Sequence, residues 1–468
     1  MSQHEVKEQV SFRDRMPLVT DKGKRKWIYA QKPHGKFYNI RSIVSIFYLL
    51  LFFSLPLIKI NGFPAVQINI PEAKFYFFGM VFWPQDFFIF GLMMVAFVVF
   101  IVLFTMIYGR VFCGWACPQT IFMEMVFRRI ETWIEGSAAH QRQLNHGSWT
   151  TERIIRKTAK HIAFFLLSFL IANTFLAYII GADELFRIIS EPVSEHIGGF
   201  LAIVGFTFVF YFVYAFVREI VCTIICPYGR LQGVLLDRNS IVVAYDYHRG
   251  EPREKGKRPA DHEGVGDCID CNQCVAVCPT GIDIRNGTQL ECTNCTACID
   301  ACNSVMSKIH LPKGLIRYAS ENEIAERTKF RFTPRMKVYS TILAALTGVI
   351  LLLLFTRKEV QFTLVRTTGQ MFQEQGKDSL SNLYNVTLIN KTHKNINAEL
   401  KVENVPANVK VVGLSGIRIP SEQKIKATVF IYMSKKDIRS RETDLKMGLY
   451  QDGKKVASEK ATFIGYTE

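Results

Sequence analysis

Eight of the twelve cysteines stand in two copies of the spacing C-x2-C-x2-C-x3-C. Three closely spaced thiolates on one loop can hold three corners of an iron–sulfur cubane, and in two-cluster ferredoxins the fourth cysteine of each run serves the other cluster. The spacing therefore predicts two 4Fe-4S clusters that relay single electrons. The expected ligands are Cys268, Cys271, Cys274 and Cys302 for the first cluster, and Cys292, Cys295, Cys298 and Cys278 for the second.

Zinc and disulfide bonds are the alternative uses of these cysteines. Zinc sites usually pair two C-x2-C hooks and have no use for a third cysteine in each loop. Disulfides are disfavoured in the reducing cytoplasm, where the charge pattern described below places this segment. One departure from the ferredoxin pattern is that Asn303 follows the last cysteine, whereas Pro279 follows Cys278. Because this change removes no ligand, the prediction of two clusters stands.

The other four cysteines form an internal repeat, Cys113-Gly-Trp-Ala-Cys117-Pro118 and Cys222-Thr-Ile-Ile-Cys226-Pro227. Each copy follows an apolar run and a basic residue, Arg110 or Arg218. Two such motifs at equivalent ends of two helical hairpins suggest a pseudo-twofold repeat that brings four thiols together. On a continuing helix the two cysteines of one motif would share a face. Such a site favours Cu(I), zinc or an iron–sulfur centre, although a redox-active dithiol or helix packing would also explain the pattern.

Membrane spans must hold these motifs in place. Hydrophobic residues make up 49% of the 468 residues and 37 residues are Phe, yet the formal net charge is +16. This combination is typical of apolar spans joined by basic loops. Five near-continuous apolar runs approach the roughly 20 residues that a bilayer requires. They are residues 43–58, 87–108, 162–180, 200–217 and 338–355.

The basic residues predict which side of the membrane each loop faces. Lys and Arg number ten in residues 1–41, eight in 109–160 and 17 in 218–337, against one each in 61–86 and 181–197. By the positive-inside rule, the N-terminus and the long central insert are cytoplasmic, and the tail from Arg357 is periplasmic in a Gram-negative cell. The expected location is the bacterial inner membrane. The polar N-terminal segment lacks the early apolar core of a cleavable signal.

The resulting order is a cytoplasmic segment 1–41, four spans with both C-x3-C-P motifs in 42–239, a ferredoxin-like insert 240–337, a fifth span 338–356 and a tail 357–468. Within the tail, short runs of β-branched and aromatic residues at 384–389, 425–432 and 445–450 predict an all-β sandwich. The tail contains no cysteine and no paired catalytic residues. We therefore interpret it as a binding or docking module.

Composition and motifs argue against several other classes of protein. No RRM, KH or zinc-finger pattern accompanies the basic charge, so nucleic acid is not an expected partner. None of the ten histidines stands in the middle of a span, which disfavours haem, and no G-x-G-x-x-G loop indicates a bound flavin or nicotinamide. The electron donor is therefore expected to be a separate molecule. The basic stretch 249–258 could receive an acidic one.

The stretch from Cys278-Pro-Thr-Gly-Ile-Asp-Ile-Arg285 through Gly287 and Gln289 to Asp300-Ala-Cys302 resembles the CcoG/FixG/RdxA family of cytochrome c oxidase accessory proteins. Five spans, paired C-x3-C-P motifs, an inserted dicluster ferredoxin and a C-terminal immunoglobulin-like domain occur together in that family. The resemblance covers most of the chain. It implies a multidomain membrane protein, with a five-helix transmembrane bundle, an inserted bacterial-type ferredoxin domain and a C-terminal all-β immunoglobulin-like sandwich.

The resemblance also implies a cupric reductase that supplies Cu(I) for the assembly of a high-affinity haem-copper oxidase. Carried over by position, the eight cysteines of the insert would hold the clusters, and Cys113, Cys117, Cys222 and Cys226 would bind copper or act as redox groups. Thiolates stabilise Cu(I) over Cu(II), which suits such a site to reducing copper. The hypothesis is that electrons pass from a donor to the first cluster, then to the second cluster and then to copper.

Two other functions remain open: a quinol-linked membrane ferredoxin that feeds a periplasmic reductase, and a redox-sensing scaffold for oxidase assembly. A copper transporter would need polar or thioether ligands along its spans, whereas the cysteines here gather at one side. The expected partners are membrane lipid, haem-copper oxidase subunits or copper chaperones, a cytoplasmic or quinol electron donor, and a second copy of the chain in a homodimer.

Overall fold

The computed structural model describes residues 18, 24–60, 62–70, 74–255, 264–357, 359–367, 371–376, 378–392, 394–412, 417–421, 423–438 and 440–465. Much of the predicted segment 1–41 and the end of the basic stretch 249–258 lie outside these residues. The chain divides into two units, one of residues 1–58 and 91–348 and the other of residues 59–90 and 349–468.

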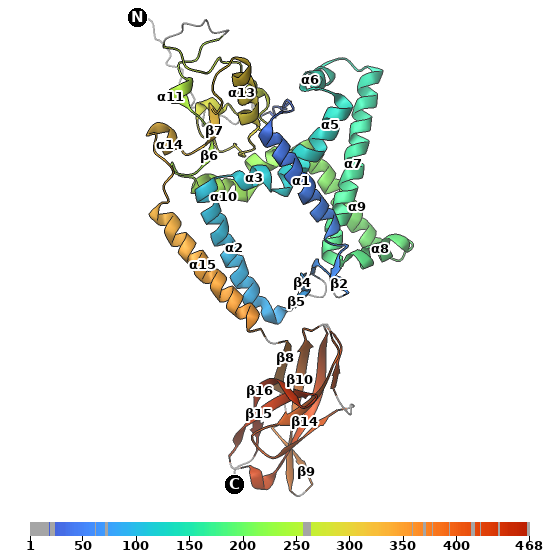
Figure 1. Cartoon of the computed structure of the whole chain (residues 1–468). Helices are drawn as coiled ribbons and strands as arrows, with labels where there is room; N and C mark the ends of the chain where they lie inside the picture. Colours follow the sequence, from blue (N-terminus) through green and yellow to red (C-terminus); the bar gives the residue numbers. More distant parts are fainter. Residues whose placement is uncertain are drawn as a thin grey trace, which may run out of the picture. The chain divides into compact units, whose positions relative to one another are not determined.

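Five helices among the described residues are long and apolar enough to cross a membrane, which confirms the five predicted spans as candidate membrane helices. They are α1 (Lys36–Ser54), α2 (Phe87–Tyr108), α7 (Thr151–Ile180), α9 (Ile197–Phe212) with its continuation η4 (Val213–Val217), and α15 (Pro334–Phe355) (Figure 1). Four of the helices begin earlier in the chain than the first residue of the predicted apolar run, because each helix extends beyond that run at its N-terminal end. In α7, for example, the Thr150 hydroxyl accepts a hydrogen bond from the backbone N–H of Arg153 at 3.3 Å and so caps the helix well before Ile162.

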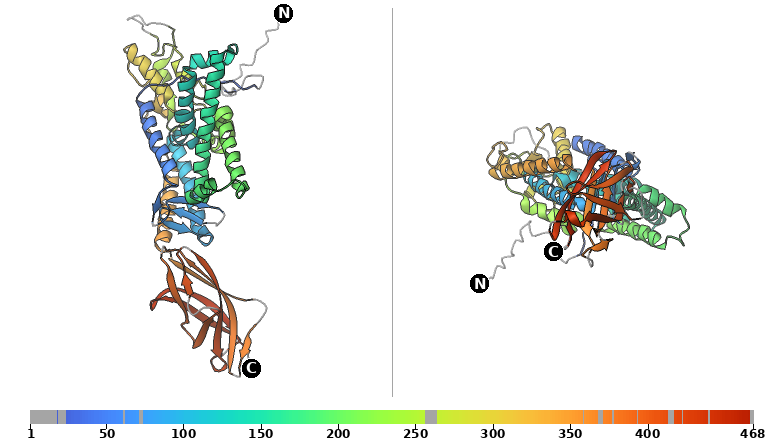
Figure 2. Two further views of the ribbon diagram at one scale, coloured as in Figure 1. Left: turned by 90° about the vertical axis from the view of Figure 1, so that its right-hand side faces the viewer. Right: turned by 90° about the horizontal axis from the view of Figure 1, so that it is seen from below.

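Short helices connect the spans of the first unit. They are α3 (Val111–Trp115), α4 (Pro118–Thr120), η3 (Ile121–Phe127), α5 (Arg128–Glu135), α6 (Ala138–His146), α8 (Ala182–Ser190), η5 (Val221–Ile225) and α10 (Pro227–Leu235). Helices α7 and α9 run side by side (Figures 1 and 2). Their core is aromatic: the Phe127 ring stacks on the Tyr214 ring with centroids 4.3 Å apart and meets Phe164 edge-on at 4.9 Å. The segments η3, η4 and η5 are π-helices, which are rare and occur frequently at functional sites.

The insert between α10 and α15 folds around its cysteines. Its elements are β6 (Val242–Tyr245), α11 (Tyr247–Gly250), α12 (Gln273–Ala276), η6 (Ile284–Asn286), α13 (Ala297–Lys308), β7 (Ile316–Ala319) and α14 (Glu321–Ala325). Strands β6 and β7 pair antiparallel, and Val242 stands opposite Ala319. Buried cysteines pack here with Ile282, Ile299 and Met306 in one core. The cysteines are therefore part of the insert's own apolar core.

A buried carboxylate fastens the insert to the first span. Asp300 of α13 accepts hydrogen bonds from the backbone N–H groups of Phe37 and Tyr38, at 3.2 and 2.7 Å. These are donors of the first turn of α1, which otherwise lack a partner in the helix. A side chain at Gly35 would overlap the Asp300 carboxylate, so glycine is required there. This cap explains why α1 begins at Lys36, before the predicted Ile43.

In the second unit, two antiparallel sheets enclose an apolar core, which confirms the predicted all-β sandwich (Figure 2). One sheet has the order β12-β14-β10-β8 with β9 added to β10, and the other has the order β13-β11-β15-β16. The strands are β8 (Val360–Arg366), β9 (Gln373–Gln375), β10 (Ser379–Asn390), β11 (Ile396–Val402), β12 (Ala407–Val411), β13 (Ile417–Ile419), β14 (Lys424–Ser434), β15 (Glu442–Gln451) and β16 (Lys454–Ile464). Buried Tyr384 of β10 donates its hydroxyl hydrogen to the Thr462 carbonyl of β16 at 2.9 Å and so ties the two sheets together.

The segment between α1 and α2 belongs to this second unit and contains strands that the sequence analysis did not predict. They are β1 (Lys59–Ile60), β2 (Phe63–Pro64), β3 (Val66–Asn69), β4 (Lys74–Phe77) and β5 (Met80–Phe82), followed by the single turn η2 (Pro84–Asp86). Buried Asp86 forms ion pairs with Arg357 at 2.5 Å and with Lys391 at 2.6 Å. Although burial acts in the opposite direction, these two cations hold the pKa of Asp86 below its ordinary value of 3.8. The carboxylate thus anchors the loop to the sandwich.

Replacement of this anchor is expected to destabilise the second unit. Asp86→Asn leaves the half-buried cations Arg357 and Lys391 without their anion, so we expect a loss of about 3 kcal/mol of unfolding free energy. The measurement is hydrogen exchange of the β10 amides in the intact protein in detergent. Because the pKa of Asp86 is lowered in the folded state, its contribution is present at neutral pH and is lost as pH falls through that lowered pKa.

The matched control for this experiment is Glu399→Gln, because Glu399 is 71% exposed and its side chain pairs only with exposed Lys401 among the ion pairs of the described residues. We expect it to change the exchange of β10 by less than about 0.5 kcal/mol. Equal exchange in Asp86→Asn and wild type at neutral pH would show that the anchor contributes nothing.

Candidate electron-transfer and metal site

Two cavities in the insert are each lined by four of the predicted cluster cysteines. The first cysteine cavity is lined by Cys268, Cys271, Cys274 and Cys302, with apolar walls that include Met306 and Leu315. The second cysteine cavity is lined by Cys278, Cys292, Cys295 and Cys298, and Cys274 stands between the two. The folded chain thus places the last cysteine of each run in the cavity lined by the other run. That these cysteines are cluster ligands stays a prediction.

Repeated backbone kinks turn the thiols of each run inward. Asp270 and Asn272 in the first run have φ values of 49° and 55°, and Asn294 and Thr296 at the equivalent places in the second run have 54° and 65°. Non-glycine residues rarely adopt this left-handed conformation. The two loops therefore share the same unusual backbone conformation at equivalent positions. Arg285 braces the first loop by donating to the side chains of Asp270 and Asn272. The sequence analysis did not identify this arginine as part of the site.

Among the described residues, the cysteine sulfurs form no ready-made site for a single metal ion. Four thiolates around one zinc ion at about 2.3 Å would lie about 3.8 Å from one another. Among the described residues, which include every cysteine, no three thiol sulfurs lie within 4.8 Å of one another. The group that does meet this limit is Glu191, Glu195 and His196, on the loop before α9. Four cysteines in one cavity are the ligand set that a four-iron cubane requires.

The C-x3-C-P motifs do not lie on continuing helices, contrary to the sequence-based expectation. Cys113 lies in α3, but Cys117 is extended (φ −64°, ψ 126°) and immediately precedes α4. In the second motif Cys222 lies in η5, and Cys226 is extended (φ −68°, ψ 111°) before α10. The physical reason is the proline after each motif, whose ring disfavours helical conformation in the residue before it. Each pair of cysteines therefore flanks a break between two helices.

The four thiols of these motifs nevertheless lie close together. Burial raises the pKa of the Cys113 thiol to about 11, although neighbouring Arg110 acts to lower it, and burial raises the pKa of Cys222 to about 12. The thiols of Cys117 and Cys226 also act to raise both pKa values. At neutral pH the buried thiols are therefore protonated, and binding of a soft metal would release protons.

A glutamine that the sequence analysis missed contacts this group. Gln232 is fully buried, and the Cys113 sulfur lies 2.8 Å from its Oε1 atom. The amide nitrogen of Gln232 donates to the Thr105 hydroxyl of α2 at 3.2 Å. These contacts fix the amide so that its oxygen faces the thiol. In the sequence, the only hint of this role is that a glutamine stands within the segment that forms α10.

The loop of the second cysteine cavity lies directly on the first C-x3-C-P motif. A methyl group at Gly114 would lie 2.5 Å from the Thr293 carbonyl oxygen and 2.9 Å from the Asn294 carbonyl carbon, so only glycine allows this approach. Trp115 donates from its indole nitrogen to the Tyr318 hydroxyl at 3.0 Å, and Tyr318 donates in turn to the Asn294 carbonyl at 3.2 Å. The loop that carries Cys292 and Cys295 is therefore held against the helix that carries Cys113.

Two further features connect the insert with the second motif. Buried Arg110 donates to the Leu290 carbonyl of the insert and, at 3.5 Å, to the Cys222 carbonyl. A small cavity is lined by Cys222 on one side and by Pro279, Thr280 and Thr293 of the insert on the other. Its walls therefore include the residues that follow Cys278 and Cys292. Both C-x3-C-P motifs thus adjoin the second cysteine cavity.

A group of buried ion pairs lies next to this site, and no sequence pattern predicted which residues pair. Arg218, with a left-handed φ of 55°, donates to both carboxylate oxygens of Glu131 at 3.0 and 2.8 Å. Lys160 of α7 pairs with Glu135 at 2.8 Å and with Glu131 at 3.5 Å. Although burial acts to raise it, Arg218 and its neighbours lower the pKa of Glu131 to about 2. The basic residue before the second motif therefore has a structural partner within the bundle.

Comparisons with known proteins define the class of this protein. Residues 217–321 match the model of a 4Fe-4S dicluster domain, and residues 90–136, which include Cys113 and Cys117, match that of a 4Fe-4S binding domain. Residues 350–466 match the immunoglobulin-like fold at the C-terminus of FixG. Together with the five candidate membrane helices, these matches make the chain a membrane iron–sulfur electron-transfer protein.

Relatives then identify the particular family. The nitrogen fixation protein FixG of Rhizobium meliloti is 33% identical over 429 residues, which cover 82% of this chain and 80% of FixG. RdxA of Cereibacter sphaeroides is 32% identical over 420 residues, with coverage of 86% and 88%, and RdxB of the same organism is 29% identical over 439 residues, with coverage of 88% and 90%. The chain belongs to the FixG/RdxA family, as its sequence motifs predicted.

Substitution of Gly114 tests the contact between the insert and the first C-x3-C-P motif. In Gly114→Ala the new methyl group meets two backbone groups that cannot rotate away, so we expect a loss of about 2 kcal/mol from overpacking. Hydrogen exchange in the intact protein should show faster exchange of the amides of residues 290–296. The matched control is Gly205→Ala in α9, where an added methyl group meets no atom within 4 Å. Unchanged exchange at 290–296 in Gly114→Ala would contradict the close approach.

Proposed function

We propose that this protein is a cupric reductase that converts Cu(II) to Cu(I) for the assembly of a high-affinity haem-copper cytochrome c oxidase. The observation that carries the proposal is the contact of the second cysteine cavity with both C-x3-C-P motifs. A one-electron carrier next to a group of four thiols suits a metal ion that is reduced by one electron. Copper would enter this reaction as the substrate.

The eight cysteines of the insert are proposed as the cluster ligands. Cys268, Cys271, Cys274 and Cys302 would hold the first 4Fe-4S cluster, and Cys292, Cys295, Cys298 and Cys278 the second, as the linings of the two cysteine cavities support. When bound, the two clusters supply one-electron reduction and oxidation. The role of the chain is to exclude water from each cavity and to hold the second cavity against the thiols of the bundle.

Cys113, Cys117, Cys222 and Cys226 are proposed as the site at which copper is bound and reduced. Thiolates favour Cu(I), so their presence would make reduction of Cu(II) more favourable. The four sulfurs form no preformed three-ligand group within 4.8 Å among the described residues, so copper would be held by fewer thiols or would draw them together. An alternative at the same place is a dithiol that is oxidised to a disulfide and gives up two electrons and two protons, enough to reduce two Cu(II) ions.

The proposed setting is the bacterial inner membrane, with the insert in the cytoplasm and the immunoglobulin-like sandwich in the periplasm. The distribution of Lys and Arg among the loops supports this orientation. The sandwich offers a surface for oxidase subunits or copper chaperones, and a second copy of the chain is a further proposed partner. Docking through the sandwich would bring the oxidase subunits that need copper to the protein that reduces the copper.

Copper reduction by the isolated protein tests this function. Anaerobically purified protein is reduced chemically, freed of reductant and mixed with Cu(II), and Cu(I) is read from the absorbance of a Cu(I) chelator. Wild type is expected to reduce copper. A variant with Cys113, Cys117, Cys222 and Cys226 all changed to Ser is expected not to, because copper then has no thiol site.

Ferricyanide, which accepts electrons without a thiol site, serves as the control and should oxidise both proteins equally. Iron content and visible absorbance show whether each protein keeps its clusters. Copper reduction at the wild-type rate by the four-serine variant would remove the proposed site. Failure of both proteins with clusters intact would favour the quinol-linked or scaffold function.

A further inference from the structure

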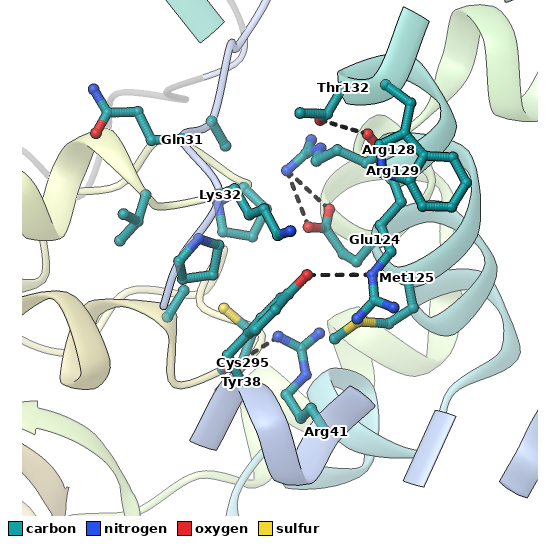
Figure 3. A pocket seen from close by; sticks show the side chains of 16 residues that line it. Gln31, Lys32, Tyr38, Arg41, Glu124, Met125, Arg128, Arg129, Thr132 and Cys295 are labelled. Carbon is teal, nitrogen blue, oxygen red and sulfur yellow. Dashed lines mark hydrogen bonds and ion pairs between the residues drawn. The ribbon is translucent and has the colours of Figure 1, made fainter. Parts of the chain in front are cut away.

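A hollow in the first unit lies where the first span meets the insert (Figure 3). Its walls come from residues 30–41, from η3 and α5, and from the two cysteine loops of the insert. Its interior volume is about 60 Å³, and it opens to the surroundings on one side. It is a separate space from the two cysteine cavities and from the C-x3-C-P motifs. We call it the α1–α5 hollow.

The α1–α5 hollow shares a wall with the second cysteine cavity. Cys295 and Ala297 line both spaces. Buried Arg41 of α1 donates to the Cys295 carbonyl at 3.0 Å, which holds this part of the loop against the hollow. A molecule in the hollow would therefore be separated from the second cluster site by a single cysteine residue. That position is useful to a molecule that exchanges electrons.

The polar groups of the hollow can both donate and accept a hydrogen bond. The Tyr38 hydroxyl accepts from Arg129 Nε at 3.2 Å, which leaves its own hydrogen to donate to a ligand. Glu124 accepts from Arg128 at 3.0 Å, and its carboxylate still points into the hollow (Figure 3). Although its partner Arg128 acts to lower it, burial raises the pKa of Glu124 above the ordinary value. A carboxylate of this kind can take up a proton and release it again.

The remaining walls suit a flat, uncharged ring at a membrane surface. Met125 and Val277 are buried, and Pro279 adds a further apolar face. Trp133 is 77% exposed at the edge of the hollow, as is common for tryptophan where protein, lipid and water meet. Tyr38 lies in the first turn of α1, a candidate span, so the hollow opens at the end of a membrane helix.

The hollow is lined by Lys32 and three arginines as well as by Glu124, and the arginines are already engaged. Its arginines already have partners: Arg128 pairs with Glu124 and Glu219, Arg129 donates to Tyr38 and Ser42, and Arg41 donates to a carbonyl. A phosphate would also face the Glu124 carboxylate across the same space. A neutral ligand with one hydroxyl or carbonyl at each end of a ring meets neither difficulty.

We propose that the α1–α5 hollow binds the head group of a membrane quinol, which donates electrons to the insert; this proposal rests on the iron–sulfur function proposed above. Oxidation of the quinol breaks two O–H bonds and yields a quinone, two electrons and two protons. Glu124 accepts one proton and water at the mouth of the hollow accepts the other. The two electrons are accommodated because the insert offers two one-electron sites.

Photolabelling tests binding without relying on electron transfer. The intact protein in phosphatidylcholine nanodiscs is illuminated with an azido derivative of decylubiquinone, and the labelled peptides are identified by mass spectrometry. We expect label in residues 30–41 or 124–133 that excess decylubiquinone prevents. Thr132→Phe, which fills the hollow, should abolish this label. The matched control is Thr347→Phe in α15, because both hydroxyls bond to the carbonyl four residues earlier and Thr347 is exposed away from the hollow.

Oxidation of the chemically reduced protein by decylubiquinone tests the role of Glu124. Glu124→Gln should keep the photolabel but be oxidised about 100-fold more slowly by the quinone, because the proton that the product needs is lost. Glu152→Gln is the matched control, since Glu152 also pairs with an arginine four residues later but is 57% exposed on α7. Ferricyanide should oxidise all variants at the wild-type rate.

The outcomes separate this proposal from the copper function. Label that decylubiquinone does not displace, or unchanged labelling in Thr132→Phe, would overturn the quinol site even if copper is reduced normally. Oxidation of Glu124→Gln by quinone at the wild-type rate would overturn the role of the carboxylate. If quinone binds and oxidises wild type but Cu(II) is not reduced, the quinol site stands and the copper function fails.

Discussion

The close approach of the Thr293 and Asn294 backbone to Gly114 is the contact on which the rest of the site depends. It can form only because residue 114 has no side chain, and it brings the loop of Cys292 and Cys295 onto the helix of Cys113. The Asp300 cap on α1 holds the other side of the insert to the bundle. The ferredoxin-like insert is therefore fixed to the membrane helices on two sides and is not a separate domain on a linker.

This arrangement gives the second cysteine cavity a central position. Both C-x3-C-P motifs adjoin it, and so does the α1–α5 hollow through Cys295. The expected order of a donor at the first cluster, then the second cluster and then copper is one route through such a site. A donor bound in the hollow would instead enter at the second cluster site, and the first would store the other electron of a two-electron donor. In that arrangement the two clusters have different tasks despite their identical spacing.

Much of the fold could be predicted from the sequence because the signals are local. Apolar length predicted five spans, and cysteine spacing predicted how the insert groups its thiols. The helix breaks at Cys117 and Cys226 were missed, although the following prolines carry the signal. Contacts such as those of Gln232 with Cys113 or Arg218 with Glu131 join residues far apart in the chain, and no spacing rule reports them. The small sheet between α1 and α2 was hidden because its strands are very short.

Single removal of each proposed cluster tests the central claim, that electrons reach the proposed copper site at the C-x3-C-P thiols from the second cluster site. Cys271→Ser affects the first cysteine cavity and Cys292→Ser the second. Both proteins are reduced chemically and mixed with Cu(II), and the initial rate of Cu(I) formation is measured per remaining cluster. Our account predicts the wild-type rate in Cys271→Ser, with a smaller total yield, and no fast phase in Cys292→Ser. The opposite result, with copper reduction lost in Cys271→Ser and retained in Cys292→Ser, would contradict it.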